Sequence, residues 1–215
     1  MKAAESISII GGADGPTSIF LAGRSGKRPL KIRIRNRIFQ LRRNRIARRI
    51  RPNAHTLREV AVFMKKHYGA VELSRESREY KEQKECLKGS LMIEHRPELL
   101  GGLSAIPRPR VYEEASIRKL YDRLQRQRER IAQIPDEQFP MDFHVYRIRL
   151  GGGRMEIEID YQWEMFGISY SGNKKEMRKL RRISRRLYIY YGVSEEDIRN
   201  CSKRYSSLLT VLASD

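Results

Sequence analysis

Acidic residues are missing from one long stretch near the N-terminus. No Asp or Glu occurs between Gly15 and Arg58, whereas the same window holds 14 Lys and Arg residues. The chain of 215 residues has a formal net charge of +19, so the 171 residues outside this window carry only +5. A block of one charge sign that is not balanced locally indicates a segment that meets an oppositely charged partner.

Long apolar runs and clustered cysteines are also absent. No stretch approaches the roughly 20 consecutive apolar residues that a membrane-spanning helix requires, so the sequence predicts no transmembrane segment. The two cysteines, Cys86 and Cys201, are far apart and have neither metal-ligand nor disulfide-framework spacing. Gly11, Gly12 and Pro16 interrupt the apolar residues near the N-terminus, which argues against a secretory signal. We therefore expect a soluble, cytoplasmic protein with reduced thiols.

Helical periodicity and capping signals account for much of the chain. The stretch from Leu30 to Ile50 places Ile34, Ile38 and Leu41 on one face, with Phe39, Ile46 and Ile50 adjoining. This spacing predicts a basic amphipathic helix that ends at Pro52. Thr56 and Glu59 have the spacing of a capping box that starts the next helix. Further helices are expected over residues 74–91, 113–134 and 174–191, and from residue 194 onward. Asn173 is expected to cap the third of these, and Gly192 to end it, as Gly69 ends the helix that starts at Thr56.

Two alternating runs predict a β-hairpin between residues 143 and 163. Apolar and charged residues alternate from Tyr146 to Leu150 and again from Met155 to Tyr161, with three glycines between the runs. Together with the helices, this hairpin predicts an α+β fold in which about five helices pack a small antiparallel sheet.

The register of this hairpin follows from the chemistry of its two faces. Pairing Leu150 with Met155 across a four-residue loop puts the apolar residues of both runs together. On the other face, Arg147 then meets Glu158, a pair of opposite charge. Because this pairing engages the acidic row from Glu156 to Asp160, we do not expect that row to bind a cation.

Proline and glycine residues between positions 96 and 112 divide the chain. Pro97, Gly101, Gly102, Pro107 and Pro109 make this the one long loop of the sequence. We expect it to link an N-terminal segment, residues 1–95, to a helix–hairpin–helix domain over residues 113–215. The N-terminal segment then holds a glycine-rich motif, the arginine-rich helix and the capped helix.

The glycine-rich motif precedes the basic window and reads IGGADGPTSIF from Ile10 to Phe20. One interpretation is a strand–turn–strand, in which the glycines supply unusual φ angles and Asp14 and Pro16 make the turn. A second interpretation is a loop for a phosphorylated ligand, because successive glycine N–H groups after a strand can form an anion site. The motif lacks the Lys-Ser/Thr ending of a P-loop.

The same motif resembles a signature of the beta subunits of sodium ion-translocating decarboxylases, which act on oxaloacetate, methylmalonyl-CoA or glutaconyl-CoA. In that family the stretch lies in a re-entrant membrane region, where its aspartate binds sodium or the counter-transported proton. The resemblance covers about a twentieth of the chain and implies an accessory or relic protein of such a sodium pump. It assigns the ion-handling carboxylate to Asp14 and places Gly11, Gly12, Gly15 and Thr17 beside the ion.

The basic window gives the leading functional interpretation. Arginine offers a planar fork that suits phosphate, and neutralising a nucleic-acid backbone releases counterions. We therefore expect a non-catalytic protein that binds nucleic acid or another polyanion, although no zinc finger, RNP or KH signature narrows the choice. An anionic membrane surface, an acidic protein or a solvated helix face are the alternatives. The arginines assigned to this interface are Arg33, Arg35, Arg37, Arg42, Arg43, Arg45, Arg48, Arg49 and Arg51.

Other functional patterns are weak or lacking. The four histidines show no metal-ligand spacing, and Asp142 and His144, which can share a strand face, have no third ligand. No nucleophile elbow or Ser/His/Asp set is recognisable. We expect no metal site, no catalytic residue and no cofactor. A second basic stretch, from Lys174 to Arg185, could extend the polyanion interface.

Overall fold

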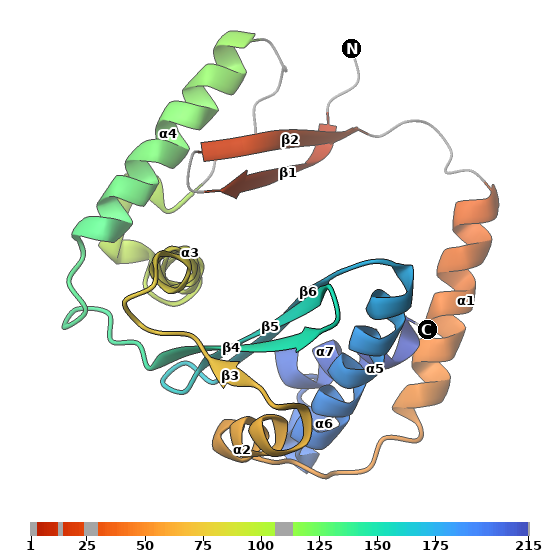
Figure 1. The fold of residues 1–215 in the computed structure, drawn as a ribbon. Coiled ribbons are helices and arrows are strands. Elements are labelled where there is room, and N and C mark those ends of the chain that lie inside the picture. The colour runs from red at the N-terminus through yellow and green to blue at the C-terminus, as the bar shows by residue number, and fades with distance from the viewer. Residues whose placement is uncertain (1–3, 13–14, 24–29, 106–113, 215) are drawn as a thin grey trace. The chain divides into compact units, whose positions relative to one another are not determined.

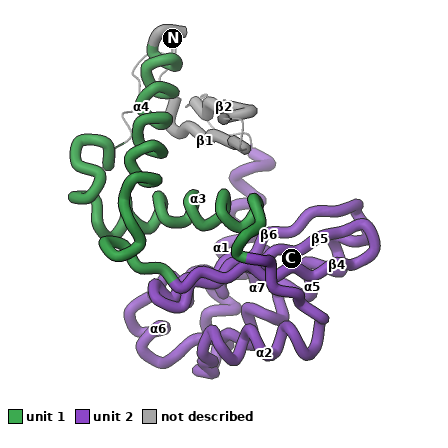
Figure 2. Tube along the Cα trace, turned by 60° about the vertical axis from the view of Figure 1, so that its left-hand side comes forward, with its two compact units in different colours: residues 1–28, 75–141 green, residues 29–74, 142–215 purple. Residues whose placement is uncertain are grey.

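The computed structural model describes residues 4–12, 15–23, 30–105 and 114–214. The chain forms two compact units, residues 1–28 with 75–141 and residues 29–74 with 142–215 (Figure 2). Within the described ranges, seven α-helices and a four-stranded antiparallel sheet confirm the α+β class, with more helices than the five expected. None of these helices combines the length and the apolarity that crossing a membrane requires.

The first unit contains a β-hairpin built from the glycine-rich motif. Strands β1 (Ala4–Gly12) and β2 (Gly15–Gly23) pair antiparallel, with Gly12 opposite Gly15 and Gly11 opposite Pro16 (Figure 1). This backbone matches the strand–turn–strand interpretation of the motif. Asp14, to which the resemblance assigns the ion-handling role, lies outside the described residues.

The same unit contains helices α3 (Arg78–His95) and α4 (Glu114–Gln133), which pack against each other. Their approach is close at Gly89, where a Cβ atom would lie 2.7 Å from Cδ1 of Ile131. Buried Lys88 donates to the backbone oxygen of Ile134 at 2.6 Å and pairs with the carboxylate of Asp136 at 3.1 Å, which compensates its charge. Between the helices, the first part of the predicted linker forms two 3₁₀ turns, Pro97–Leu99 and Gly101–Leu103.

The second unit is centred on the four-stranded sheet, whose order is β3-β4-β5-β6 (Figure 1). Strands β4 (Phe143–Leu150) and β5 (Gly153–Asp160) are the predicted hairpin. The sequence reading missed β6 (Met165–Ser171), which pairs with β5, and the short β3 (Val71–Glu72) lies on the other edge of the sheet.

The predicted register of the hairpin is wrong by two residues. Met155 lies opposite Ile148, not Leu150, and the turn consists of Gly151 and Gly152 alone. A shift of two residues leaves the apolar face unchanged, because side chains alternate with a period of two. On the other face, however, Arg147 meets Glu156 and forms an ion pair at 2.6 Å. Glu158 lies opposite Val145 instead of Arg147.

In the observed register, the carboxylate of Glu158 has no arginine opposite it on β4. Burial raises the pKa of its carboxyl, and the negative charge of Glu156 adds to the effect. As the pH falls, the folded chain therefore takes up this proton before the unfolded chain does, and stability rises.

Glu158→Gln is expected to raise the free energy of unfolding near neutral pH by no more than about 1 kcal/mol. The amide removes the cost of keeping a partly buried carboxylate charged. The variant should also lose the gain in stability that the parent shows as the pH falls toward the ordinary glutamate range. Urea unfolding at neutral and mildly acidic pH measures both effects. The control is the same substitution at the neighbouring glutamate, Glu156→Gln, which breaks the ion pair with Arg147 and should lower the free energy of unfolding. An equal loss of unfolding free energy in both variants would contradict this account.

Helices α2 (Leu57–Tyr68) and α5 (Lys174–Tyr191) cover the apolar face of the sheet (Figure 1). Both predicted caps are present, the Thr56–Glu59 capping box and the capping of α5 by Asn173. The core between these helices and the sheet is fully buried. It is formed chiefly by Val60, Met64, Met155, Ile157, Ile159, Leu180 and Leu187.

The remaining helices of this unit are α1 (Leu30–Ala47), α6 (Glu195–Arg199) and α7 (Lys203–Ala213). The helix expected from residue 194 onward is thus two helices. Helix α1 packs against α7 and ends at Ala47, well before Pro52. Of the predicted apolar stripe of α1, Ile34, Ile38 and Leu41 are exposed. The adjoining Phe39 and Ile46 are half-buried, as is Ala47.

Candidate polyanion interface

The arginines assigned to the interface lie on α1 and on the segment that follows it. Arg43 is half-buried and the others are exposed. Arg33 to Arg45 belong to the helix, whereas Arg48 and Arg49 form the turn after Ala47 and Arg51 lies in the connection to α2. The nine predicted residues therefore form a helix with a basic extension, not one continuous basic helix.

Helix α5 presents a second basic surface, as the sequence suggested. Its one acidic residue, Glu176, serves structure, because its carboxylate accepts hydrogen bonds from the backbone N–H groups of Asn173 at 2.9 Å and Gly152 at 2.8 Å. No other acid occurs between Met165 and Ser194. The exposed basic residues of α5 are Lys174, Lys175, Arg178, Lys179, Arg181, Arg182 and Arg186.

The tyrosines at the end of α5 belong to the interior of the unit. The ring of Tyr190 stacks on Phe63 at 4.0 Å and on His55 at 4.1 Å. Tyr188 packs its ring edge-on against Phe166, and burial raises the pKa of its hydroxyl. These rings hold α5 in place and are not free to stack on bases of a ligand.

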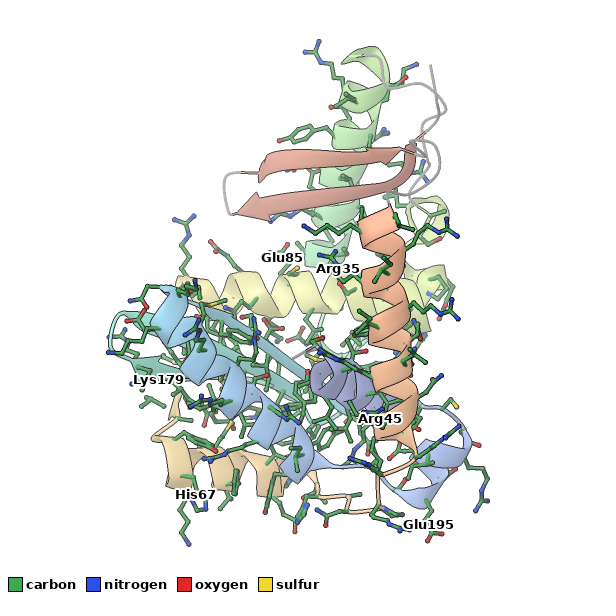
Figure 3. The ribbon with its side chains drawn as sticks, turned by 90° about the vertical axis from the view of Figure 1, so that its right-hand side faces the viewer. Arg35, Arg45, His67, Glu85, Lys179 and Glu195 are labelled. Atoms are coloured by element: carbon green, nitrogen blue, oxygen red, sulfur yellow. The ribbon has the colours of Figure 1, made fainter. Side chains whose placement is uncertain are left out.

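Helix α7 brings the two basic helices together within the second unit. Both α1 and α5 contact α7. In Figure 3 the two basic helices lie on the side facing the viewer, with α7 between them, and the labelled Arg35, Arg45 and Lys179 mark them. Residues more than 120 positions apart in the sequence thus contribute to one basic side of the unit.

The charge on this side of the unit is poorly balanced. The second unit holds 27 of the 45 Lys and Arg residues but only 12 of the 26 acidic residues, so it carries +15 of the net charge. Leaving Arg42 aside, none of the exposed basic residues of α1 and α5 forms an ion pair with a described carboxylate. Such a surface attracts polyanions and repels other cations.

A backbone junction fixes the segment between α1 and α2 to the end of α5. The N–H groups of Asn53 and His55 donate to the oxygens of Val193 and Tyr191, at 2.9 and 3.0 Å. Arg204 of α7 donates to the oxygens of Gly192 and His55, both at 2.8 Å, and to that of Tyr191. This junction anchors the chain between the two basic helices, and no local pattern in the sequence predicts it.

A cavity of about 280 Å³ opens beside this junction. Arg58, whose guanidinium lies 4.9 Å from the ring centre of Tyr161, and Glu164 line it together with Arg204. Because Arg204 donates to backbone carbonyls and Glu164 brings a negative charge, the cavity has no convergent set of groups for an anion.

The Asp142–His144 pair is part of a larger cluster. The Nε2 atom of His144 lies 3.0 Å from Asp142, and its Nδ1 atom faces Glu72 of β3. The imidazole thus lies between the carboxylates of Asp142 and Glu72. Among the described residues, no group of three His, Cys, Asp or Glu is placed to hold a metal ion.

The structure does not bring the two predicted sites into one unit. Gly11, Gly12, Gly15 and Thr17 belong to β1 and β2 of the first unit, whereas α1 and α5 belong to the second. No protein-family model matches the chain, and no curated protein or solved structure matches it significantly.

Proposed function

We propose that this protein binds nucleic acid through the basic side of its second unit, with α1 and α5 as the contacting helices. The observation that carries this proposal is the attachment of two basic, acid-poor helices to the same helix, α7. We call the exposed basic residues of α1 and α5, with Arg48, Arg49 and Arg51, the basic surface.

The length and composition of the basic surface suit a phosphate backbone. Each helix has 18 residues, or about 27 Å at 1.5 Å per residue. One strand of a DNA duplex presents about eight phosphates over that length. Arginine predominates, and its planar donors match phosphate oxygens in pairs. Because no base-reading motif accompanies these residues, backbone contacts should dominate and sequence preference should be weak.

The first test is binding of the full chain to a labelled single-stranded RNA and a labelled DNA duplex, each of about 16 nucleotides or base pairs. The dissociation constant should rise steeply with salt. Arg178→Gln/Arg182→Gln/Arg186→Gln should weaken binding about tenfold and lower the slope of log K against log salt by about two to three. Fluorescence anisotropy at several salt concentrations measures both quantities.

A matched control removes the same charge elsewhere. Arg118, Lys119 and Arg128 are exposed on α4 of the first unit, so their triple glutamine variant has the same net charge as the α5 variant. It should bind nearly as well as the parent. Equal losses in the two variants would mean that net charge alone attracts the ligand. Binding to heparin without binding to either nucleic acid would overturn the choice of nucleic acid.

We further propose a cytoplasmic location, where RNA and DNA are accessible and the exposed unpaired cysteines Cys86 and Cys201 would stay reduced. The decarboxylase resemblance of residues 10–20 stays a prediction, because its central residue, Asp14, lies outside the described residues. The interpretation of the same motif as a loop for a phosphorylated ligand also stays a prediction.

A further inference from the structure

Helix α1 has two apolar stripes on opposite sides. At about 100° per residue, Phe39 and Ile46 fall within about 20° of each other, on the half-buried side that packs toward α7. Leu30, Ile34 and Leu41 fall within about 40° of one another on the opposite side, and Ile38 borders them. We call these four residues the outer stripe.

The outer stripe is exposed along its whole length. Leu30 is 68% exposed, Ile34 51%, Ile38 47% and Leu41 63%. Single exposed apolar residues are common on protein surfaces. A row of four along about 17 Å of one helix is different, because a continuous apolar patch marks a surface that another molecule covers.

The charges beside the outer stripe restrict what can cover it. Around the helix, Arg33 and Arg37 fall on one side of the stripe and Arg35 and Arg42 on the other, whereas Arg45 continues the line of the stripe one turn beyond Leu41. No acidic residue lies in this part of the chain. The covering molecule must therefore be apolar in the middle and negative on both sides. A second copy of α1 does not meet this requirement, since it brings the same positive charges.

An anionic lipid bilayer meets both requirements. Interfacial helices place Leu, Ile or Phe between the acyl chains and Arg or Lys among the lipid phosphates. The stripe lies on the side of α1 opposite the side that packs on α7, and all four of its side chains are exposed. Helix α5 differs in this respect, because its exposed residues from Lys174 to Arg182 are all polar or charged.

We propose that the outer stripe of α1 binds this protein to anionic lipid bilayers. This proposal rests on the exposed apolar residues together with the arginines beside them, and it does not require that the protein bind nucleic acid. The two ligands would compete for the arginines of α1, whereas α5 would remain open to nucleic acid.

The experiment is flotation of the full chain with vesicles of phosphatidylcholine alone and of phosphatidylcholine mixed with phosphatidylglycerol. Binding is expected to the mixed vesicles only. Ile34→Ser/Leu41→Ser should weaken it at least about tenfold, because two apolar side chains no longer enter the bilayer. The matched control is Val62→Ser/Val71→Ser, which removes apolar residues that are 65% and 68% exposed on other elements and should bind as the parent does.

A second readout tests insertion directly. Ile34→Trp adds an indole to a chain whose only tryptophan is Trp163. With mixed vesicles, the fluorescence of this variant should shift to shorter wavelength and be quenched by brominated acyl chains, relative to the parent protein. The same variant without vesicles should show neither change.

Three results would overturn the proposal. The first is binding to mixed vesicles that the double serine variant retains in full, which would indicate adsorption by charge alone. The second is no binding to vesicles together with self-association that Ile34→Ser/Leu41→Ser abolishes, which would identify a second copy as the partner. The third is binding to RNA or DNA but not to vesicles, in which case the proposed function would stand and this inference would fail.

Discussion

Gly192→Ala is expected to lower the free energy of unfolding by about 3–5 kcal/mol. Gly192 has φ 59° and ψ −159°, a backbone conformation that residues other than glycine rarely adopt. A Cβ atom built on it would lie 1.7 Å from the backbone oxygen of Asn53. That oxygen belongs to the backbone junction between α1 and α2, so it cannot move away without breaking the adjacent hydrogen bonds.

Gly69→Ala is the matched control for this prediction. Gly69 ends α2 with φ 63° and ψ 35°, and no atom lies within 4 Å of its Cβ position. It therefore reports the cost of the left-handed backbone alone, about 1 kcal/mol. Urea unfolding of both variants separates the two causes. If Gly192→Ala cost no more than Gly69→Ala, the contact with Asn53 would not be as close as the structure has it.

The sequence predicts that both glycines end helices, but it does not predict the close contact that requires glycine at position 192. Helix ends follow from short-range chemistry, and the caps at Thr56 and Asn173 were predicted for the same reason. The contact of Gly192 with Asn53 joins residues 139 positions apart. Nothing in the local sequence reports such a contact, because a glycine after a helix is already explained by the helix end.

The register of the β4–β5 hairpin could not be predicted from the alternation of apolar and charged residues. Both registers put the same apolar residues on the core face, so alternation could not choose between them. In the observed register Gly153 is the first residue of β5 and lies against α5. A Cβ atom at this position would lie 2.9 Å from the Cβ atom of Glu176. Gly153 is therefore a strand residue that lets α5 approach the sheet. The sequence reading had placed it in the loop with Gly151 and Gly152.

The candidate site was predicted in part, for a similar reason. Charge counts along the sequence located the arginines of α1, and a basic stretch identified α5. Helix α1 has two apolar stripes, whereas the sequence pattern predicts one, with Ile34, Ile38 and Leu41 on it and Phe39 and Ile46 adjoining. Only the position of α7 decides which stripe is covered. The difference matters, because the exposed stripe is the feature from which we infer a lipid partner.

Arg204→Met is expected to cost about 2–4 kcal/mol of unfolding free energy. The guanidinium donates to three backbone carbonyls, and it lies 3.6 Å from the ring centre of Tyr191. Methionine fills similar space but donates nothing, so the three carbonyl oxygens lose the guanidinium as a donor, and only that of Tyr191 retains a hydrogen bond already described, from the N–H of His55. Arg204→Lys should recover little, because a single ammonium cannot reproduce the planar fork. Arg199→Met, at an exposed position on α6, should change stability by less than about 0.5 kcal/mol.

Hydrogen exchange can show that this loss is local to the backbone junction. In Arg204→Met, the amides of Asn53 and His55 should exchange faster, since their acceptors belong to the same segment that Arg204 holds. Amides of α4, in the other unit, should be unaffected beyond the change in global stability. Uniform acceleration throughout the chain would mean that Arg204 supports the fold as a whole. Faster exchange confined to Asn53 and His55 would instead show that one α7 side chain holds the segment between α1 and α2 against the end of α5.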